Sequence, residues 1–303
     1  MKDFTVSILG NGSAVPTAYQ NPSSQLIKYK KLRFLVDCGE GTQMQFIKYG
    51  FSYRNLSHIF ISHLHGDHYL GLAGLVSTFH LYGRKAPLHI FGPAPLETVI
   101  QQQFLISDTQ LQFELVFHRL EGEQLLYDDK HLQVCSFPLK HSVPTWGFLF
   151  REKENTERNL DKDFVALYKP KIEQMRKIKQ GADFVSPEGK LFKNKEITLD
   201  GPPPRSFAYC SDTLYDENIV PKIKGVDLLY HEATFDNATD AKAAEKMHTT
   251  AAQAATIAKL AGAKSLLLGH FSARFSNLTH LLKEGCDIFP QTMISEQGKT
   301  YEI

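Results

Sequence analysis

The stretch His63-Leu64-His65-Gly66-Asp67-His68 indicates the fold and chemistry of this chain more clearly than any other stretch. It follows the apolar run Ile59-Phe60-Ile61. Alternate residues of an extended segment point the same way. The first two histidines can therefore hold one metal ion while the aspartate and the last histidine turn toward a second. Clustered polar side chains at a strand end need satisfied partners, which packing alone does not supply. We interpret the stretch as a metal site; the alternative is a solvated histidine-rich loop.

The composition is that of a globular chain, with 303 residues, of which 42% are hydrophobic and 22% charged. Such a chain forms one large domain or two small ones and buries about three quarters of its unfolded surface. A net charge of +1 does not indicate a nucleic-acid or membrane partner, so any such surface must be local. No Cys-x-x-Cys pair occurs, which argues against a disulfide framework or a thiolate zinc site and favours a reducing compartment. The cysteines are Cys38, Cys135, Cys210 and Cys286.

The amino-terminal stretch enters an alternating strand pattern without an apolar signal core. No apolar run reaches membrane-spanning length. We therefore expect a soluble, cytoplasmic protein with no membrane partner.

Short apolar segments separated by Gly, Pro, Asn and Asp predict strands throughout the first half. Later strands alternate with helical patterns, which predicts sheets covered by helices. One helix is marked at both ends, because Thr250 and Gln253 form a capping box and Gly262 follows its last apolar residue. The predicted strands are 5–9, 32–36, 58–62, 88–91, 113–117, 132–137, 207–210, 228–230 and 265–268, and the predicted helices are 42–49, 70–80 and 250–261.

Residues 151–204 differ from the rest of the chain, since they are rich in Lys and Glu and poor in strand signals. Residues 169–195 have a local net charge of +5, whereas the rest of the chain sums to −4. A helix is expected to start at Pro170, with Ile172, Met175 and Ile178 on one face and Gly181 past its end. An arm that binds phosphates and a merely solvated charged loop both fit this pattern. The candidate phosphate-binding residues are Lys169, Lys171, Arg176, Lys177, Lys179, Lys190 and Lys193.

Three isolated residues at the ends of later strand patterns are candidates to complete a site for two ions: His141, Asp212 and His270. Loops at strand ends are where folds usually place chemistry, so these residues could converge with residues 63–68. Taken singly, each has an ordinary structural explanation, such as a turn or helix cap for the aspartate. Only the three residues taken together with residues 63–68 indicate a metal site.

Residues 63–68 with the downstream His, Asp and His resemble the metallo-β-lactamase superfamily, and further motifs are similar to those of its ribonuclease Z family. The supporting stretches are residues 10–17 (GNGSAVPT), 36–43 (VDCGEGTQ), 231–235 (HEATF) and 269–275 (GHFSARF). The resemblance spans nearly the whole chain. It implies an α/β fold in which two mixed sheets pack face to face between outer helices, a four-layer αββα sandwich with the metals at one edge. It also implies a homodimer.

The same resemblance implies a single domain over residues 1–303, with a flexible arm inserted at about 151–204 that grips the tRNA elbow. Backbone phosphates favour Lys and Arg and make binding salt-dependent. In the family, a Gly-Pro pair usually precedes a Gly-Lys-Leu stretch in this arm, whereas residues 186–191 here read Ser-Pro-Glu-Gly-Lys-Leu.

Carried over residue by residue, the resemblance implies two Zn²⁺ per chain. One ion would be held by His63, His65 and His141, and the other by Asp67, His68 and His270, with Asp212 bridging them. Nitrogen and carboxylate ligands also accept Mn²⁺ or Fe²⁺. Asp37 would orient a ligand histidine from outside this set.

The activity implied is that of a zinc-dependent endoribonuclease that removes the 3′ trailer from precursor tRNA. A hydroxide shared by the metals would attack the phosphodiester, leaving a 3′ hydroxyl on the tRNA and a 5′ phosphate on the trailer. Asp67 would accept a proton as well as bind metal. His248, oriented by Glu232, would contact the scissile phosphate or protonate the leaving oxygen, because it precedes a helix whose amino end favours anions. The alternatives are another phosphodiesterase or small-ester hydrolase on this fold, or a non-catalytic RNA-binding subunit.

Overall fold

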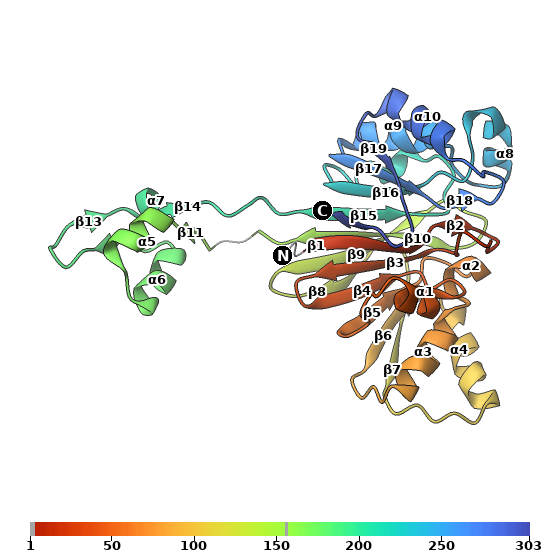
Figure 1. The fold of residues 1–303 in the computed structure, drawn as a ribbon, viewed down its shortest axis with the longest axis horizontal. Helices are drawn as coiled ribbons and strands as arrows, with labels where there is room; N and C mark the ends of the chain where they lie inside the picture. Colours follow the sequence, from red (N-terminus) through yellow and green to blue (C-terminus); the bar gives the residue numbers. More distant parts are fainter. Residues whose placement is uncertain (1–3, 155–156) are drawn as a thin grey trace. The chain divides into compact units, whose positions relative to one another are not determined.

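Two mixed seven-stranded sheets form the centre of the molecule in the computed structural model, which describes residues 4–154 and 157–303 (Figure 1). In the first sheet, the first four strands run antiparallel to their neighbours. The fourth strand is also the first of a parallel set that it forms with the last three. In order, this sheet contains β20 (Thr300–Glu302), β1 (Phe4–Gly10), β3 (Ser24–Tyr29), β4 (Leu32–Val36), β5 (Leu56–Phe60), β6 (Leu88–Gly92) and β7 (Leu115–Arg119). The second contains β19 (Thr292–Ile294), β17 (Ser265–Gly269), β16 (Leu228–Glu232), β15 (Ser206–Cys210), β10 (Thr145–Glu152), β9 (Leu132–Leu139) and β8 (Gln124–Asp128).

Helices cover the outer face of each sheet, which confirms the predicted four-layer αββα sandwich (Figure 1). The first sheet packs on α1 (Thr42–Lys48), α3 (Leu72–Leu81) and α4 (Pro95–Ile106), and the second on α9 (Ala251–Ala261) and α10 (Thr279–Ile288). The shorter elements are α2 (Gly66–Tyr69), α8 (Asp240–Glu245), the turns η1 (Glu217–Ile219) and η2 (Asn237–Thr239), and the paired strands β2 (Gly12–Ser13) and β18 (Phe271–Ser272).

Aromatic side chains fill the space between the two sheets. Phe60 of β5 packs on Phe148 and Phe150 of β10 with ring centroids 5.4 and 5.7 Å apart, and Phe34 of β4 also contacts Phe150 at 5.7 Å. All four rings are fully buried. Each such pair contributes about 0.5–1.5 kcal/mol beyond its buried area, so this layer holds the two sheets firmly and fixes the strand ends that position the site.

Helix α9 has the ends that the sequence predicts. The Gln253 N–H donates to Thr250 Oγ1 at 3.2 Å, the Gln253 side chain accepts from the Thr250 N–H at 3.1 Å, and Gly262 ends the helix at φ 62°. The capping box and the glycine terminator are therefore confirmed.

Two predicted boundaries near residue 63 are wrong. The strand expected at 58–62 is β5, Leu56–Phe60, and it ends there because the Ser62 N–H donates to Asp37 Oδ1 at 2.7 Å and not to a neighbouring strand. The helix expected at 70–80 is α3, Leu72–Leu81, and Gly71 separates it from the short helix α2, Gly66–Tyr69, which was not predicted. The chain passes so close to that glycine that a Cβ there would lie 2.1 Å from the Gly39 carbonyl oxygen.

Contacts divide the chain into two compact units, Met1–Tyr127 with Val134–Phe150 and Ser206–Ile303, and Asp128–Gln133 with Arg151–Arg205. The second unit has its own small core of Phe164, Ile178, Phe184 and Ile197. Residues 155–156, within the segment expected to form an arm, lie outside the described residues. The elements of this unit are β11 (Asn159–Leu160) paired with β14 (Thr198–Leu199), β12 (Phe184–Val185) paired with β13 (Leu191–Phe192), and helices α5 (Lys162–Tyr168), α6 (Ile172–Lys179) and α7 (Asn194–Ile197).

The helix expected after Pro170 is α6, and Gly181 follows it with φ 103°. Ile178 is buried as expected, but Ile172 is 66% exposed, so the predicted three-residue apolar face is wrong at its first position. The core of this unit is too small to reach the first turn of the helix. In the described part of the chain, no helix has the length and hydropathy needed to cross a membrane.

Candidate metal centre

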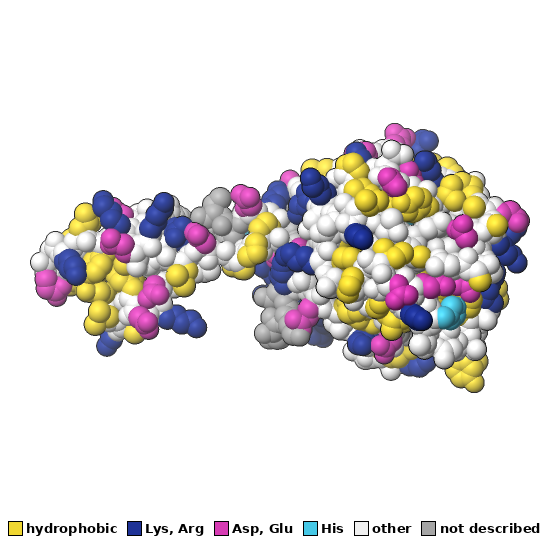
Figure 2. Space-filling view, turned by 90° about the horizontal axis from the view of Figure 1, so that it is seen from above, with side chains coloured by type: hydrophobic (Ala, Val, Ile, Leu, Met, Phe, Trp, Pro, Cys, Tyr) yellow, Lys and Arg dark blue, Asp and Glu magenta, His cyan; other side chains and the backbone are white. Residues whose placement is uncertain are grey.

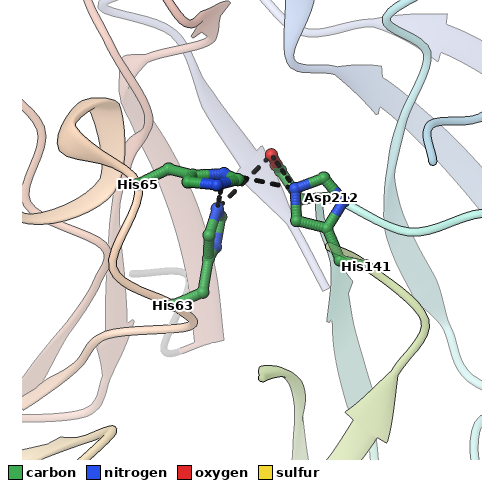
Figure 3. Close-up of side chains that lie close together, drawn as sticks. All are labelled: His63, His65, His141 and Asp212. Atoms are coloured by element: carbon green, nitrogen blue, oxygen red, sulfur yellow. Dashed lines mark hydrogen bonds and ion pairs between the residues drawn. The ribbon is translucent and has the colours of Figure 1, made fainter. Parts of the chain in front are cut away.

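Four of the predicted ligands point toward one another from three separate loops (Figure 3). His63 and His65 follow β5, His141 follows β9, and Asp212 follows β15. His65 Nδ1 lies 3.1 Å from His63 Nε2 and 3.2 Å from His141 Nε2, while Asp212 Oδ2 lies 3.5 and 3.7 Å from the same two Nε2 atoms. These four atoms surround one point.

The other three predicted ligands form a second group beside the first. Asp67 and His68 lie on helix α2, and His270 follows β17. Asp67 Oδ2 lies 3.4 Å from the Nε2 atoms of both histidines, which are 3.3 Å from each other. Asp212 reaches this group with its other oxygen, Oδ1, at 3.2 Å from His68 and 3.1 Å from His270. The structure thus brings all seven residues together, with Asp212 between the two groups.

The spacing of the donor atoms fits two divalent ions. Nitrogen and oxygen ligands lie about 2.0–2.2 Å from a tetrahedral Zn²⁺, which places neighbouring donor atoms about 3.3–3.6 Å apart. The observed separations of 3.1 to 3.7 Å bracket that range. The His/Asp groups are therefore consistent with a dinuclear metal site.

The ionisation of the site also favours bound cations. Burial and the neighbouring His68 hold the pKa of His63 well below its usual value, so this imidazole is neutral. Burial acts to raise the pKa of Asp212, but His270 and His68 outweigh it and lower that pKa, so the carboxylate is ionised. For His68, burial is outweighed by Asp212 and Asp67, which raise its pKa, so without metal this imidazole carries a proton that a bound cation would displace. Neutral imidazoles and ionised carboxylates are the forms that bind metal, and the excess of carboxylate charge attracts a cation.

Three site residues have left-handed backbone conformations at the ends of strands. Asp37 follows β4, Asp212 follows β15 and His270 follows β17, with φ of 57°, 55° and 56°. Each such residue costs about 1–3 kcal/mol unless the surrounding structure compensates, and such conformations occur mainly at functional sites. Here they turn the side chains from three strands toward the same centre.

Asp37 holds His68 from behind. Its Oδ2 accepts from His68 Nδ1 at 2.7 Å, from Ser62 Oγ at 2.9 Å and from the Tyr209 hydroxyl at 2.6 Å. A histidine that donates from Nδ1 has its lone pair on Nε2, so this contact fixes the tautomer in which Nε2 faces the centre. His141 is oriented in the same way, because its Nδ1 donates to the Met247 carbonyl oxygen at 3.0 Å.

Glu232 is the hub of a second buried network, which the sequence predicted only in part. Glu232 Oε1 lies 2.9 Å from His248 Nδ1, as expected, and also accepts from the Thr213 N–H at 2.6 Å, next to Asp212. Thr234 Oγ1 donates to Glu232 Oε2 at 2.6 Å and, having one proton, accepts from His270 Nδ1 at 2.9 Å. Thr234 thus joins the predicted ligand His270 to Glu232. Its place in the 231–235 stretch was the only signal for it in the sequence.

His248 lies next to the metal centre, at the amino end of α9. One of its ring nitrogens lies within 4.8 Å of a donor atom of Asp212 and of a donor atom of His270. Burial acts to lower the pKa of His248, but the Glu232 carboxylate outweighs it and raises that pKa to about 9. The sequence predicted that the amino end of α9 would favour an anion. In the structure the Glu232 carboxylate takes this place, because the Thr249 N–H donates to its Oε2 at 3.2 Å. The next helix N–H, that of Ala251, donates to the Phe235 carbonyl oxygen.

A cavity of about 620 Å³ opens over these residues. Its floor includes His65, Asp67, Asp212, His248 and His270. Three basic side chains line it as well, Lys242, Lys246 and Arg274. Glu245 lines the cavity too and pairs with Lys246 at 2.9 Å. Basic side chains beside a site for two metals suit a phosphodiester substrate.

Known proteins similar to this chain share its full length. Ribonuclease Z of Bacteroides thetaiotaomicron is 46% identical, with 100% of this chain and 96% of that protein covered, and ribonuclease Z of Bacteroides fragilis is 44% identical, with 98% of each covered. The chain belongs to the ribonuclease Z family. The crystal structure of human tRNase Z, short form, covers 99% of both chains with a TM-score of 0.72 and 29% identity. The predicted family and its metallo-β-lactamase fold are therefore confirmed.

A family model described as anti-Pycsar protein Apyc1 matches residues 4–133 of the enzyme. That segment contains residues 63–68 but ends before His141, Asp212, His248 and His270. It therefore covers less than half of the chain and only part of the metal centre.

Proposed function

We propose that the enzyme, a metal-dependent tRNA 3′-processing endonuclease, uses two Zn²⁺ per chain to cut precursor tRNA. The products would be a 3′ hydroxyl on the tRNA and a 5′ phosphate on the trailer. The observation that supports this mechanism is the pair of donor groups sharing Asp212, directly beside His248 and Glu232. Incubation of the purified, metal-assayed protein with precursor tRNA, followed by mapping of both product ends, tests it. A 2′,3′-cyclic phosphate on the tRNA, which attack by the RNA's own 2′ hydroxyl would leave, contradicts the proposal.

When bound, the two cations would supply a water that ionises near neutral pH and would stabilise charge gathering on the phosphate. The nitrogen and oxygen donors suit Zn²⁺, and Mn²⁺ and Fe²⁺ accept the same set. His63, His65 and His141 would hold one ion, Asp67, His68 and His270 the other, and Asp212 both.

Of the two roles assigned to Asp67, the electrostatics favour that of ligand. Burial acts to raise its pKa, but His68 and His270 outweigh burial and lower it well below the usual range. Its Oδ2 also accepts from the Ala14 N–H at 2.7 Å. A carboxylate held so firmly ionised is a weak proton acceptor, so we assign its proton-accepting role second place.

His248 is proposed as the acid that protonates the leaving 3′ oxygen. With a pKa raised to about 9, its imidazole is protonated at neutral pH. Nδ1 donates to Glu232, which leaves the Nε2 proton for the substrate. The side chain lines the cavity and is 15% exposed, so a phosphodiester on the metals can reach it.

Replacing Glu232 with glutamine tests this assignment through pH. The amide no longer stabilises the imidazolium, so the pKa of His248 falls. His248 then gives up its proton at a lower pH than in the wild-type enzyme. We expect the alkaline limb of the kcat–pH profile for precursor tRNA to move to lower pH in Glu232→Gln, with metal content retained. Glu121→Gln, at an exposed site paired with Arg119, is the matched control and leaves the profile unchanged. An unshifted limb in Glu232→Gln would remove His248 from the role of acid.

We further propose that residues 151–204 form an inserted arm that binds the tRNA. The seven basic residues singled out in the sequence are all exposed. Lys193 is partly neutralised by Asp183 at 3.0 Å, and Lys190 lies over the Phe192 ring at 4.8 Å. The basic residues 171, 176, 177 and 179 of the α6 region have no such partner in the described residues. On this unit, basic side chains are interspersed with hydrophobic and acidic ones (Figure 2), which suits binding along a shaped RNA backbone.

Neutralising the basic residues around α6 should weaken RNA binding without affecting the chemistry. In a variant with Lys171, Arg176, Lys177 and Lys179 replaced by glutamine, we expect a higher KM for precursor tRNA and an unchanged rate on a small phosphodiester. For each ion pair with a phosphate that the variant can no longer form, the slope of log affinity against log salt should fall by about 0.7–0.9. Steady-state kinetics at several salt concentrations measures both effects. Equal losses on the two substrates would show that the arm acts on the metal site and not on tRNA.

A homodimer is the assembly we propose. Large apolar side chains stand exposed on α1, α3 and α4, which pack on the first sheet; they are Met44, Ile47, Leu81, Leu105 and Ile106. Such a concentration on one layer favours an interface with a second copy. Sedimentation should give twice the mass of the 34.3 kDa chain, and Ile106→Asp should shift it toward monomer.

A further inference from the structure

One wall of the cavity has a flat cationic surface made by Arg274 and Phe235. The Arg274 guanidinium carbon lies 4.6 Å from the centre of the Phe235 ring. Its Nε donates to Ser272 Oγ at 2.9 Å, in the short strand β18 that pairs with β2. The guanidinium plane is therefore fixed on one face by a ring and on one edge by a hydrogen bond.

The outer part of this guanidinium is open to a ligand. Arg274 is exposed and lines the cavity, whereas Phe235 is only 2% exposed and serves as its support. No carboxylate in the described residues lies within ion-pair distance of Arg274. An immobilised, unpaired guanidinium plane at a nucleic-acid site is suited to stack on a base, because every base has a π-face.

The position of this surface relative to His248 indicates which base it meets. The Phe235 ring lies 6.0 Å from the His248 ring, so Phe235 neighbours both Arg274 and His248, and all three line the cavity. If His248 protonates the leaving oxygen, as proposed above, then the sugar that carries this oxygen lies against His248. Its base is the last base of the tRNA product, on the 5′ side of the cut.

We propose that Arg274, held flat by Phe235, stacks on the base immediately 5′ of the scissile phosphate. This assignment rests on the proposed function, since it takes the side of the cut from the role of His248. Lys242 and Lys246 are exposed at the same cavity, where Lys246 pairs with Glu245 at 2.9 Å. Positive charge is thus not unique to Arg274 at this cavity, and planarity is the property that distinguishes it.

The test pairs a protein change with a substrate change. Arg274→Lys keeps the positive charge but removes the planar guanidinium. A precursor tRNA with an abasic residue 5′ of the cut keeps the backbone but lacks the base. We expect each change alone to lower kcat/KM about 5- to 150-fold, the range that stacking of one base supports. Because both changes remove the same interaction, the two together should lower kcat/KM no further than either alone.

Three outcomes would overturn the stacking assignment: full activity in Arg274→Lys, which would indicate a charge contact; multiplicative effects of the two changes; or the same coupling with the abasic residue placed 3′ of the cut. Phe235→Leu removes the support and should reduce sensitivity to the abasic residue in the same way. Arg119→Lys, at an exposed site outside the cavity, is the matched control. If wild-type enzyme failed to cut intact precursor tRNA at this position, the proposed function would fail instead, so the two failures are distinguishable.

Discussion

Replacing His248 with alanine is expected to lower kcat for precursor tRNA about 10²- to 10⁴-fold, the contribution of a well-placed general acid. Nδ1 of this side chain is engaged by Glu232 at 2.9 Å, and its raised pKa keeps the imidazole protonated. His248 belongs to neither of the two groups assigned as ligands. Both cations should therefore remain bound, as metal analysis of the variant would show.

The substrate provides a further check on the role of His248. A precursor tRNA with sulfur in place of the bridging 3′ oxygen has a leaving group that needs no protonation, so it should restore much of the rate to His248→Ala. Loss of metal together with activity would show that His248 maintains the metal site and does not act on the substrate. Thermal unfolding separates both outcomes from misfolding, since the replacement leaves the buried Glu232 carboxylate without its cationic partner.

Replacing Asp212 with asparagine is expected to have the broadest effect, because its two oxygens face different donor groups. Oδ2 lies 3.5 Å from His63 Nε2, whereas Oδ1 lies 3.1 Å from His270 Nε2. The amide lacks the negative charge that Asp212 shares between both ions. It also no longer raises the pKa of His68. Loss of an outer hydrogen-bond partner costs about 10–100-fold in metal affinity, so loss of a shared ligand should cost more than about 100-fold.

Metal titration and activity measured on the same preparation test this prediction. Asp216→Asn is the matched control, since Asp216 lies four positions farther along the same segment and pairs with Lys140 at 3.1 Å. The control should bind two ions and remain active. Full metal occupancy in Asp212→Asn would mean that the two groups are held independently and that Asp212 does not bridge them.

Local patterns account for the parts of the fold that the sequence predicted. Helix α9 was predicted with both its caps because the capping box and Gly262 act within a few residues of each other. Strand β10, Thr145–Glu152, was missed. Its first six residues are all buried, so the apolar and polar positions do not alternate as they do in a half-buried strand. The small core of the second unit was also missed, since its four apolar residues are spread from Phe164 to Ile197.

For the site, the sequence by itself determined the chemistry of residues 63–68, because those ligands are close along the chain and their spacing restricts where they can point. The distant residues His141, Asp212 and His270 were candidates from their positions after strand patterns, and motif resemblance then assigned each of them to a metal. Only the tertiary structure decided that Thr234 joins His270 to Glu232 and that Phe235 supports Arg274. These contacts depend on which strands are neighbours and on the backbone angles where those strands end. Interactions across the whole fold set both, and no local pattern in the sequence records them.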